Sequence, residues 1–256
     1  MPRFFLRMSF KGTAYSGWQI QDNAISVQEK LNHALSTVMG YAVETIGCGR
    51  TDTGVHAKQF FTHFDVPEIP VTNERFFYSL NSILPPDISI HEIIPVKDNN
   101  HARFDATSRT YEYFVNTGKN SFLREFTMFT PVIPDIALMN EAASHLTGTG
   151  DYSSFSKTHT QVKTNICEIS KATWEQRKGL FVFTITADRF LRGMVRAIVG
   201  TLLDAGISKI EPARIREIIN SKNRSEAGVT VPACGLYLSE IKYPYIPDSV
   251  LLNFPA

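Results

Sequence analysis

Apolar residues occupy every second position from Phe4 to Phe10, and this period of two predicts a β-strand. A different pattern begins at Ser26, where Ser-Val-Gln-Glu matches a capping box. From there to Met39 the apolar residues recur on one face of a helix. The start of the chain therefore predicts a strand followed by an amphipathic helix.

The rest of the chain continues this mixture of patterns. Apolar runs bounded by turn residues predict further strands at residues 41–48, 59–66, 89–96, 109–116, 165–174, 180–187 and 236–242. The turn between the fifth and sixth of these contains Lys178-Gly179, which predicts a hairpin. Helical periodicity predicts helices at residues 72–83, 135–146, 190–203 and 212–220.

These elements fall into two similar halves. Residues 97–100 are polar, and they are the best candidate for a boundary between a domain of residues 1–97 and a domain of residues 98–256. Each half mixes strands with helices, which predicts an antiparallel sheet covered by helices on one face. The expected class is α+β.

Composition and charge exclude several classes of protein. The chain has 256 residues, of which 43% are hydrophobic and 20% charged, so it is neither disordered nor fibrous. Its net charge of +1 excludes a wholly basic nucleic-acid binder, although a local basic surface stays open. Three distant cysteines form no zinc pattern and favour a reducing compartment. Arg3 and Arg7 interrupt the first apolar run, and no stretch matches a membrane span, so an intracellular protein without membrane contact is expected.

The segment of residues 49–57 carries the candidate chemistry. It places Arg50, Asp52 and His56 between two predicted strands and contains two glycines. A carboxylate in such a loop can act as a nucleophile or a base. Equally, Asp52 can form an Asx turn with Arg50 as its surface partner. No second carboxylate, phosphate-binding loop or metal-ligand spacing accompanies it.

This segment, Gly-Arg-Thr-Asp-Thr-Gly-Val-His-Ala, resembles the signature of the TruA-type tRNA pseudouridine synthases. The resemblance continues in the order of the family through residues 15–19, 27–28, 84–88, 101–106, 109–113, 190–196 and 235–238. The chain departs from the family at residues 150–152, which are Gly-Asp-Tyr where His-Asp-Phe is common. A second departure is Asn100, which stands where an aromatic residue often precedes His-Ala-Arg-Phe.

The resemblance implies both a fold and a reaction. The fold is two ferredoxin-like (RRM-like) halves whose antiparallel sheets join, with the active cleft between them. The reaction is the isomerisation of uridine to pseudouridine at positions 38, 39 and 40 of the anticodon stem and loop of tRNA. The resemblance further implies a cytoplasmic homodimer that uses no metal and no organic cofactor.

The resemblance also assigns roles to four residues. Asp52 matches the catalytic carboxylate, Tyr111 the tyrosine of the active site, and Arg196 the arginine that pairs with the carboxylate. Arg50 is expected to contact a flanking phosphate or to displace the target base. Without the resemblance, Tyr111 is a core aromatic residue of a strand, Arg196 a solvated helix residue and Arg50 a turn cation.

A basic surface is expected around the predicted helix 190–203. Residues 188–224 hold eight Lys or Arg and four Asp or Glu, and Arg189, Arg192 and Arg196 share the spacing of one helix face. This face can follow phosphates or can be solvated.

Two other functions remain as alternatives. One is a noncatalytic RNA-binding module with RRM-like halves, although the aromatic signature strand of that class is absent from the sequence. The other is an acid–base hydrolase that uses Asp52, which the lack of a partner carboxylate disfavours.

Overall fold

The computed structural model describes residues 1–67, 74–157 and 164–247 of the chain. The chain divides into two compact units. Unit 1 comprises Met1–Thr107 and Leu238–Ala256, and unit 2 comprises Ser108–Tyr237. The domain limits expected from the sequence, residues 1–97 and 98–256, stay a prediction. Each unit combines a sheet with helices, so the predicted α+β class is confirmed at this level.

Unit 1 contains the strands β1 (Arg3–Phe10), β2 (Ile46–Gly47), β3 (His56–Asp65), β4 (Ile88–Val96) and, from Leu238 on, β10 (Leu236–Lys242). β1 is the central strand and pairs antiparallel with β3 and with β4. β2 and β10 both pair with β3. The alternation from Phe4 to Phe10 therefore predicts the strand correctly, and the strand lies between two others of its sheet.

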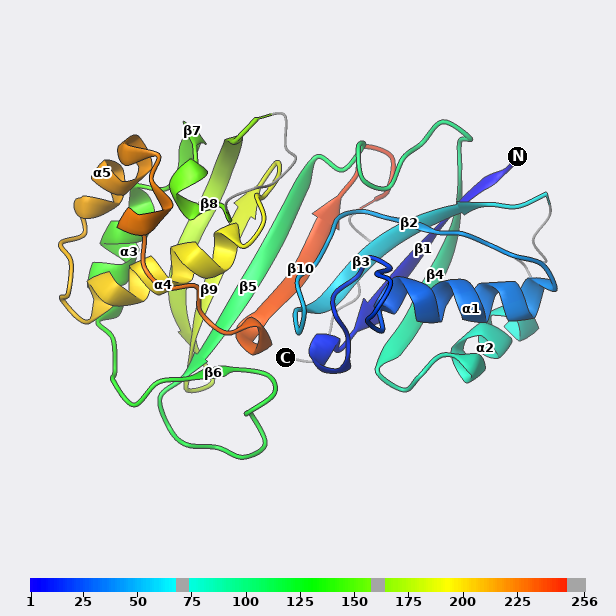
Figure 1. The fold of residues 1–256 in the computed structure, drawn as a ribbon, viewed down its shortest axis with the longest axis horizontal. Helices are drawn as coiled ribbons and strands as arrows, with labels where there is room; N and C mark the ends of the chain where they lie inside the picture. The colour runs from blue at the N-terminus through cyan, green and yellow to red at the C-terminus, as the bar shows by residue number, and fades with distance from the viewer. Residues whose placement is uncertain (68–73, 158–163, 248–256) are drawn as a thin grey trace. The chain divides into compact units, whose positions relative to one another are not determined.

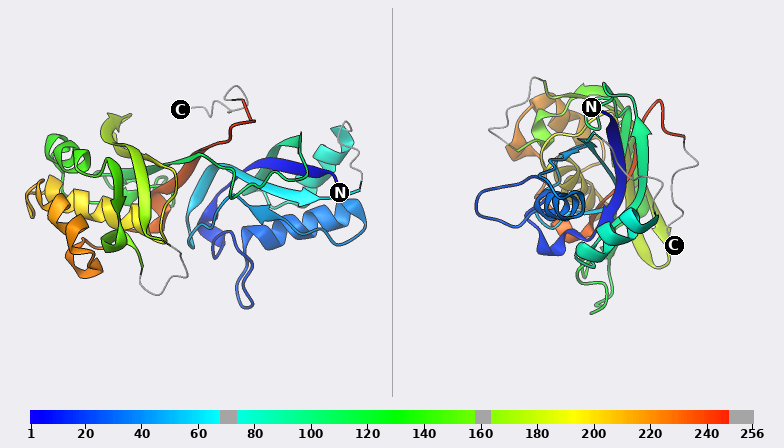
Figure 2. Two further views of the ribbon diagram at one scale, coloured as in Figure 1. Left: turned by 90° about the horizontal axis from the view of Figure 1, so that it is seen from above. Right: turned by 90° about the vertical axis from the view of Figure 1, so that its right-hand side faces the viewer.

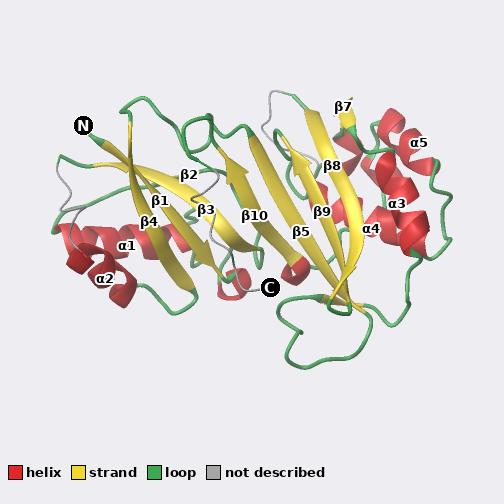
Figure 3. Cartoon of the chain, turned by 180° about the vertical axis from the view of Figure 1, so that it is seen from behind, coloured by secondary structure: helices red, strands yellow, loops and turns green. Residues whose placement is uncertain are grey.

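The helices of unit 1 are α1 (Val27–Met39) and α2 (Glu74–Ile83). The predicted capping box is present, because Ser26 and Glu29 each accept from the backbone N–H of the other. α1 lies in front of the strands of unit 1 in Figure 1 and behind them in Figure 3, so it covers one face of the sheet. In the left panel of Figure 2, which views the sheet edge-on, α1 lies to one side of these strands. The predicted start of α2 at residue 72 lies outside the described residues.

The strand expected at residues 41–48 is wrong over most of its length, since β2 has two residues. Side chains of α1 bind the backbone of this segment and replace a strand partner. Ser36 Oγ accepts from Val43 N–H at 2.9 Å, and Asn32 Oδ1 accepts from Thr45 N–H at 3.1 Å. Gln28 Nε2 donates to the carbonyl of Thr45 at 2.6 Å. Buried backbone groups need partners, and here a helix supplies them.

Unit 2 contains the strands β5 (Ser108–Asn116), β6 (Met128–Phe129), β7 (Gly148–Asp151), β8 (Ile166–Arg177) and β9 (Leu180–Ala187). The order is β5-β9-β8-β7 with antiparallel pairing, and β6 pairs parallel with β5. Lys178 and Gly179 both have positive φ, of 52° and 79°, in the turn between β8 and β9. These are the backbone angles of a two-residue hairpin turn, so the predicted hairpin is confirmed.

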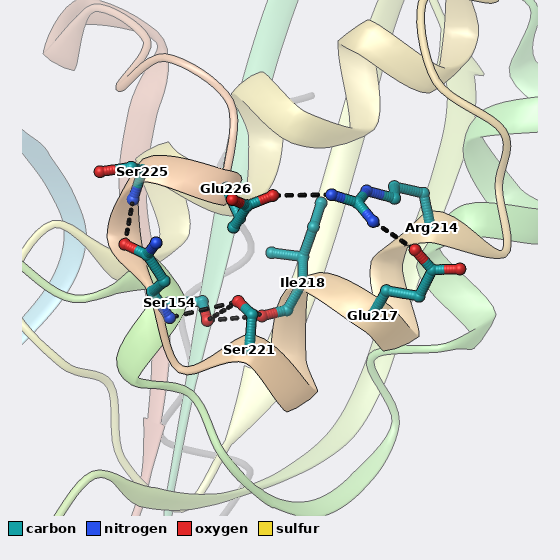
Figure 4. A network of polar contacts seen from close by, with 8 residues as sticks. Ser154, Arg214, Glu217, Ile218, Ser221, Ser225 and Glu226 are labelled. Atoms are coloured by element: carbon teal, nitrogen blue, oxygen red, sulfur yellow. Dashed lines mark hydrogen bonds and ion pairs between the residues drawn. The ribbon is translucent and has the colours of Figure 1, made fainter.

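The helices of unit 2 are α3 (Ile136–Ser144), α4 (Met194–Gly206) and α5 (Arg214–Ser221). The carboxylate of Asp135 caps α3, accepting from the N–H groups of Ala137 and Leu138. Around α5, Ser154 Oγ donates to the carbonyl of Ile218 at 2.5 Å, and the Arg214 guanidinium binds the carboxylates of Glu217 and Glu226. Figure 4 shows these contacts, which connect α5 with Ser154 and Glu226.

The helix expected at residues 190–203 begins four residues later than predicted. Gly193 has a φ of +73°, which is outside the helical region, and α4 starts only at Met194. Arg189 and Arg192 therefore lie before the helix. The predicted arginine face of Arg189, Arg192 and Arg196 is wrong, because only Arg196 belongs to α4.

A cluster of aromatic side chains packs around β1 and β3. The rings of Phe5 and Phe61 both pack edge-on against Tyr243, at 5.4 and 5.1 Å between centroids. His63 stacks on Phe5 at 5.9 Å, and its Nδ1 accepts from Ala102 N–H at 3.2 Å. Burial, helped by the charge of Arg3, lowers the pKa of His63 to about 4.

This lowered pKa predicts that acid destabilises the fold. The unfolded chain binds a proton at His63 near pH 6.5, whereas the folded chain does so only near pH 4. The free energy of unfolding should therefore fall as the pH drops from 6.5 towards 4, by about 1–2 kcal/mol at pH 5 from this group. Urea unfolding of His63→Asn between pH 5 and 7 should show a weaker pH dependence than the wild type. His33→Asn, an exposed site on α1, is the control; equal slopes in all three proteins would contradict the prediction.

Candidate functional site

The segment of residues 49–57 runs from the end of β2 into the start of β3 in unit 1, and its loop contains a tight turn. Val55 N–H donates to the carbonyl of Asp52 at 3.2 Å, which closes a β-turn. Gly54 occupies the third position with a φ of +79°, as a type II turn requires. Asp52 is half-buried at the first position of the turn, and Arg50 is exposed two residues before it. The structure thus brings these two predicted residues together on one loop.

The backbone of this loop packs directly against the backbone of residues 12–17, which follow β1. Gly12 N–H donates to His56 Nδ1 at 3.1 Å, and Gly54 N–H donates to the carbonyl of Tyr15 at 3.3 Å. A Cβ atom at position 12 would lie 2.0 Å from the carbonyl oxygen of Val55. Only glycine permits this approach.

Gly17 makes a second approach of the same kind. Its φ is +89°, and a Cβ atom there would lie 2.2 Å from the carbonyl oxygen of Thr51. Thr51 immediately precedes Asp52, so the contact fixes the backbone at the candidate catalytic residue. The segment of residues 12–17 is therefore the support of the loop.

A third segment joins this support. The hydroxyl of Tyr15 donates to Asp87 Oδ1 at 2.5 Å, and Lys11 N–H donates to the carbonyl of Asp87 at 2.9 Å. Burial and this hydrogen bond raise the pKa of Tyr15 well above its usual value. Residues 15–19, 49–57 and 84–88, which are distant in sequence, meet around one loop. The sequence motifs mark all three segments, but local patterns do not reveal that they touch.

His56 has a positioning role that the sequence does not reveal. Its side chain is 2% exposed, and its Nδ1 accepts from the backbone. The neutral ring therefore carries its proton on Nε2. Among the residues that the structure describes, no group of three or more His, Cys, Asp or Glu could hold a metal ion.

Tyr111 and Arg196 belong to unit 2. Tyr111 lies on β5 opposite Ile185 and is half-buried, and its ring meets Phe190 edge-on at 5.1 Å. Its neighbour Tyr113 is fully buried and donates to the carbonyl of Pro232. The role of a core aromatic thus fits Tyr113 better than Tyr111, which is only partly buried.

Arg196 lies in the first turn of α4. Its Nε donates to the carbonyl of Val231 at 2.6 Å, and the side chain is half-buried. This bond fixes one edge of the guanidinium group and so sets its direction. A solvated arginine on an open helix face would not be held in this way.

Comparisons with known proteins identify the family. A family model described as tRNA pseudouridine synthase matches residues 142–244. The tRNA pseudouridine synthase A of Bacteroides fragilis is 48% identical over 245 residues, which cover 95% of this chain and 97% of the relative. The enzyme of the same name from Porphyromonas gingivalis is 47% identical over 247 residues, 95% and 98% of the two chains. That of Bacillus subtilis is 38% identical over 240 residues, 92% and 97% of the two chains.

The chain belongs to the tRNA pseudouridine synthase A family. The resemblance predicted from the motifs is thereby confirmed, and membership of a pseudouridine synthase family makes the chain an isomerase. None of the helices in the described ranges has the length and apolar character needed to cross a membrane. The roles of Asp52, Arg50, Tyr111 and Arg196 stay predictions.

The glycine contacts predict a specific effect on activity. Gly17→Ala should lower the rate of pseudouridine formation about 10–100-fold, because the added Cβ displaces Thr51 and with it Asp52. Gly40→Ala is a matched control, since Gly40 has a similar φ of +77° but no atom within 4 Å of the added Cβ. It should cost about 1 kcal/mol of stability and leave the rate unchanged. Equal rates in the two folded variants would contradict the account of the loop.

Proposed function

We propose that this chain isomerises uridine to pseudouridine at positions 38, 39 and 40 of the anticodon stem and loop of tRNA, with Asp52 as the catalytic carboxylate. The observation that carries the proposal is that Gly12, Gly17 and His56 fix the backbone of the loop around one carboxylate, Asp52. The names of relatives that this chain matches along nearly their whole length support tRNA as the substrate.

The reaction needs few chemical groups. The bond between N1 of uracil and C1′ of ribose breaks, the ring turns, and a bond forms between C5 and C1′. C5 loses a proton and N1 gains one, so no redox change takes place. A single carboxylate can serve as nucleophile at the ring or the sugar, or as a base at the sugar. Asp52 is half-buried, so it is accessible to a substrate while its loop stays fixed.

A uridine in a stacked arm must first leave the stack, which costs a few kcal/mol. Tyr111 is proposed to stack on the extruded ring, and its edge-on contact with Phe190 supports this role because it fixes the plane of the ring. Arg50 is proposed to contact the flanking phosphate or to displace the base, and its exposed position supports contact with RNA.

Arg196 is proposed to pair with Asp52 in the assembled site. Such a pair keeps the carboxylate ionised and oriented. The hydrogen bond from its Nε to Val231 supports the proposal, because it presents the guanidinium in one direction.

The proposal includes ferredoxin-like halves with joined sheets around an active cleft. In unit 1, β4, β1, β3 and β2 are neighbours in this order, with α1 after β1 and α2 after β3, which supports a βαββαβ arrangement. We further propose that the enzyme acts as a homodimer in the cytoplasm and needs no metal or organic cofactor.

Loss of the Asp52 carboxylate tests the proposal. Asp52→Asn and Asp52→Ala should abolish tritium release from tRNA labelled at C5 of uridine, and should keep the fold and tRNA binding, since phosphate contacts dominate affinity. Asp22→Asn, an exposed carboxylate in the same unit, should keep full activity.

More than a trace of tritium release by either Asp52 variant would contradict the assignment. A wild-type protein that binds tRNA without releasing tritium would instead indicate a noncatalytic binding module.

A further inference from the structure

The turn of residues 100–105 in unit 1 is fixed by side chains from distant parts of that unit. Its Ala102 N–H donates to His63 Nδ1 at 3.2 Å, and its Ala102 carbonyl accepts from the Tyr243 hydroxyl at 2.5 Å. Arg3 donates to the carbonyl of Asn100 at 2.7 Å. Strand β1, strand β3 and the segment after β10 therefore hold the same six residues.

Side chains of the turn itself, together with Tyr245, add further hydrogen bonds. Asp105 Oδ2 accepts from His101 N–H at 2.8 Å and from the hydroxyl of Tyr245 at 2.9 Å. His101 Nδ1 in turn accepts from the N–H groups of Arg103 and Phe104, at 3.0 and 3.3 Å. These hydrogen bonds fix the backbone of the turn.

This rigid turn displays an aromatic ring to solvent. Phe104 is 74% exposed. The guanidinium carbon of Arg103, also exposed, lies 5.7 Å from the centre of the ring, and the His101 ring lies 4.3 Å from it. Burial of a phenylalanine side chain stabilises a fold, so this fold forgoes that gain at a position that it fixes firmly.

We infer that the turn of residues 100–105 is an RNA-binding platform, on which Phe104 stacks against a single-stranded base while Arg103 contacts an adjacent phosphate. The inference rests on the proposed function, since it assumes that RNA is the substrate, and it adds a subsite distinct from the residues that act on the target uridine.

The chemistry of the turn favours RNA over a protein partner. Single-stranded RNA is recognised through exposed aromatic rings that stack on bases, beside arginines that bind phosphates. A contiguous apolar patch of several hundred Å² is what would mark a hydrophobic protein interface. Phe104 instead projects from a turn of polar residues, and it is the exposed large apolar side chain of the described segment 97–107.

Equilibrium binding of an unmodified tRNA to the full chain tests the platform. Phe104→Ala should raise the Kd about 5- to 150-fold, as the loss of one stacked base does. Tyr78→Ala is the matched control, because Tyr78 is also 74% exposed in unit 1 but lies on α2. It should leave the Kd unchanged. Arg103→Gln should flatten the slope of log K against log salt by about 0.7–0.9, and Phe104→Ala should leave that slope unchanged.

A tryptophan at the same position reports stacking directly. Phe104→Trp should retain affinity, and tRNA should quench its fluorescence beyond that of the wild type, whose Trp18 and Trp174 are buried. Tyr78→Trp should show no added quenching.

An unchanged Kd for Phe104→Ala, or no added quenching of Phe104→Trp, would overturn the inference. A change of oligomeric state in sedimentation with an unchanged Kd would assign the turn to a protein contact and would also overturn it. If the wild type releases tritium from tRNA labelled at C5 of uridine, only the platform fails; if the wild type neither binds tRNA nor releases tritium, the proposed function fails with it.

Discussion

The close approach of two backbones is the constraint on which the candidate site depends. Residues 12–17 contact the loop that carries Asp52 so closely that positions 12 and 17 exclude a Cβ atom. Backbone contacts of this kind leave no side chain to rearrange, so they define the loop more firmly than side-chain packing would. The carboxylate is thereby held on a rigid element before any substrate arrives, which is the condition for efficient positioning in catalysis.

Neutral histidines extend the same principle through unit 1. His56, His63 and His101 each use Nδ1 to accept a backbone N–H, from Gly12, from Ala102, and from Arg103 and Phe104. Each ring satisfies backbone donors that no strand or helix could reach. These histidines act as caps of irregular backbone, and protonation at Nδ1 would remove the acceptor. For His63 and His101, burial lowers the pKa and so favours the neutral ring that this role requires.

Periodicity predicts the regular elements well and the irregular backbone poorly. The strand of residues 236–242 and the capped start of α1 agree with the structure because their signals are local. The expected strand at 41–48 fails because side chains of α1 satisfy its backbone. The expected helix at 190–203 starts late because Gly193 adopts a positive φ, which a hydrophobic pattern does not encode.

The candidate site shows the same limit. The motif around Asp52 marks the loop, yet spacing alone favours an Asx turn over a catalytic carboxylate. Gly12, Gly17 and the acceptor role of His56 follow only from contacts between segments about 40 residues apart, which periodicity cannot reveal.

Substitution of His56 tests most directly whether the support of the loop sets the activity. Asn places an oxygen acceptor near the position of Nδ1, whereas Leu fills the buried space without an acceptor. We expect His56→Asn to retain most of the single-turnover rate of pseudouridine formation. His56→Leu should lose about 10–100-fold in that rate while it stays folded and keeps its affinity for tRNA. A wild-type rate in folded His56→Leu would contradict the account.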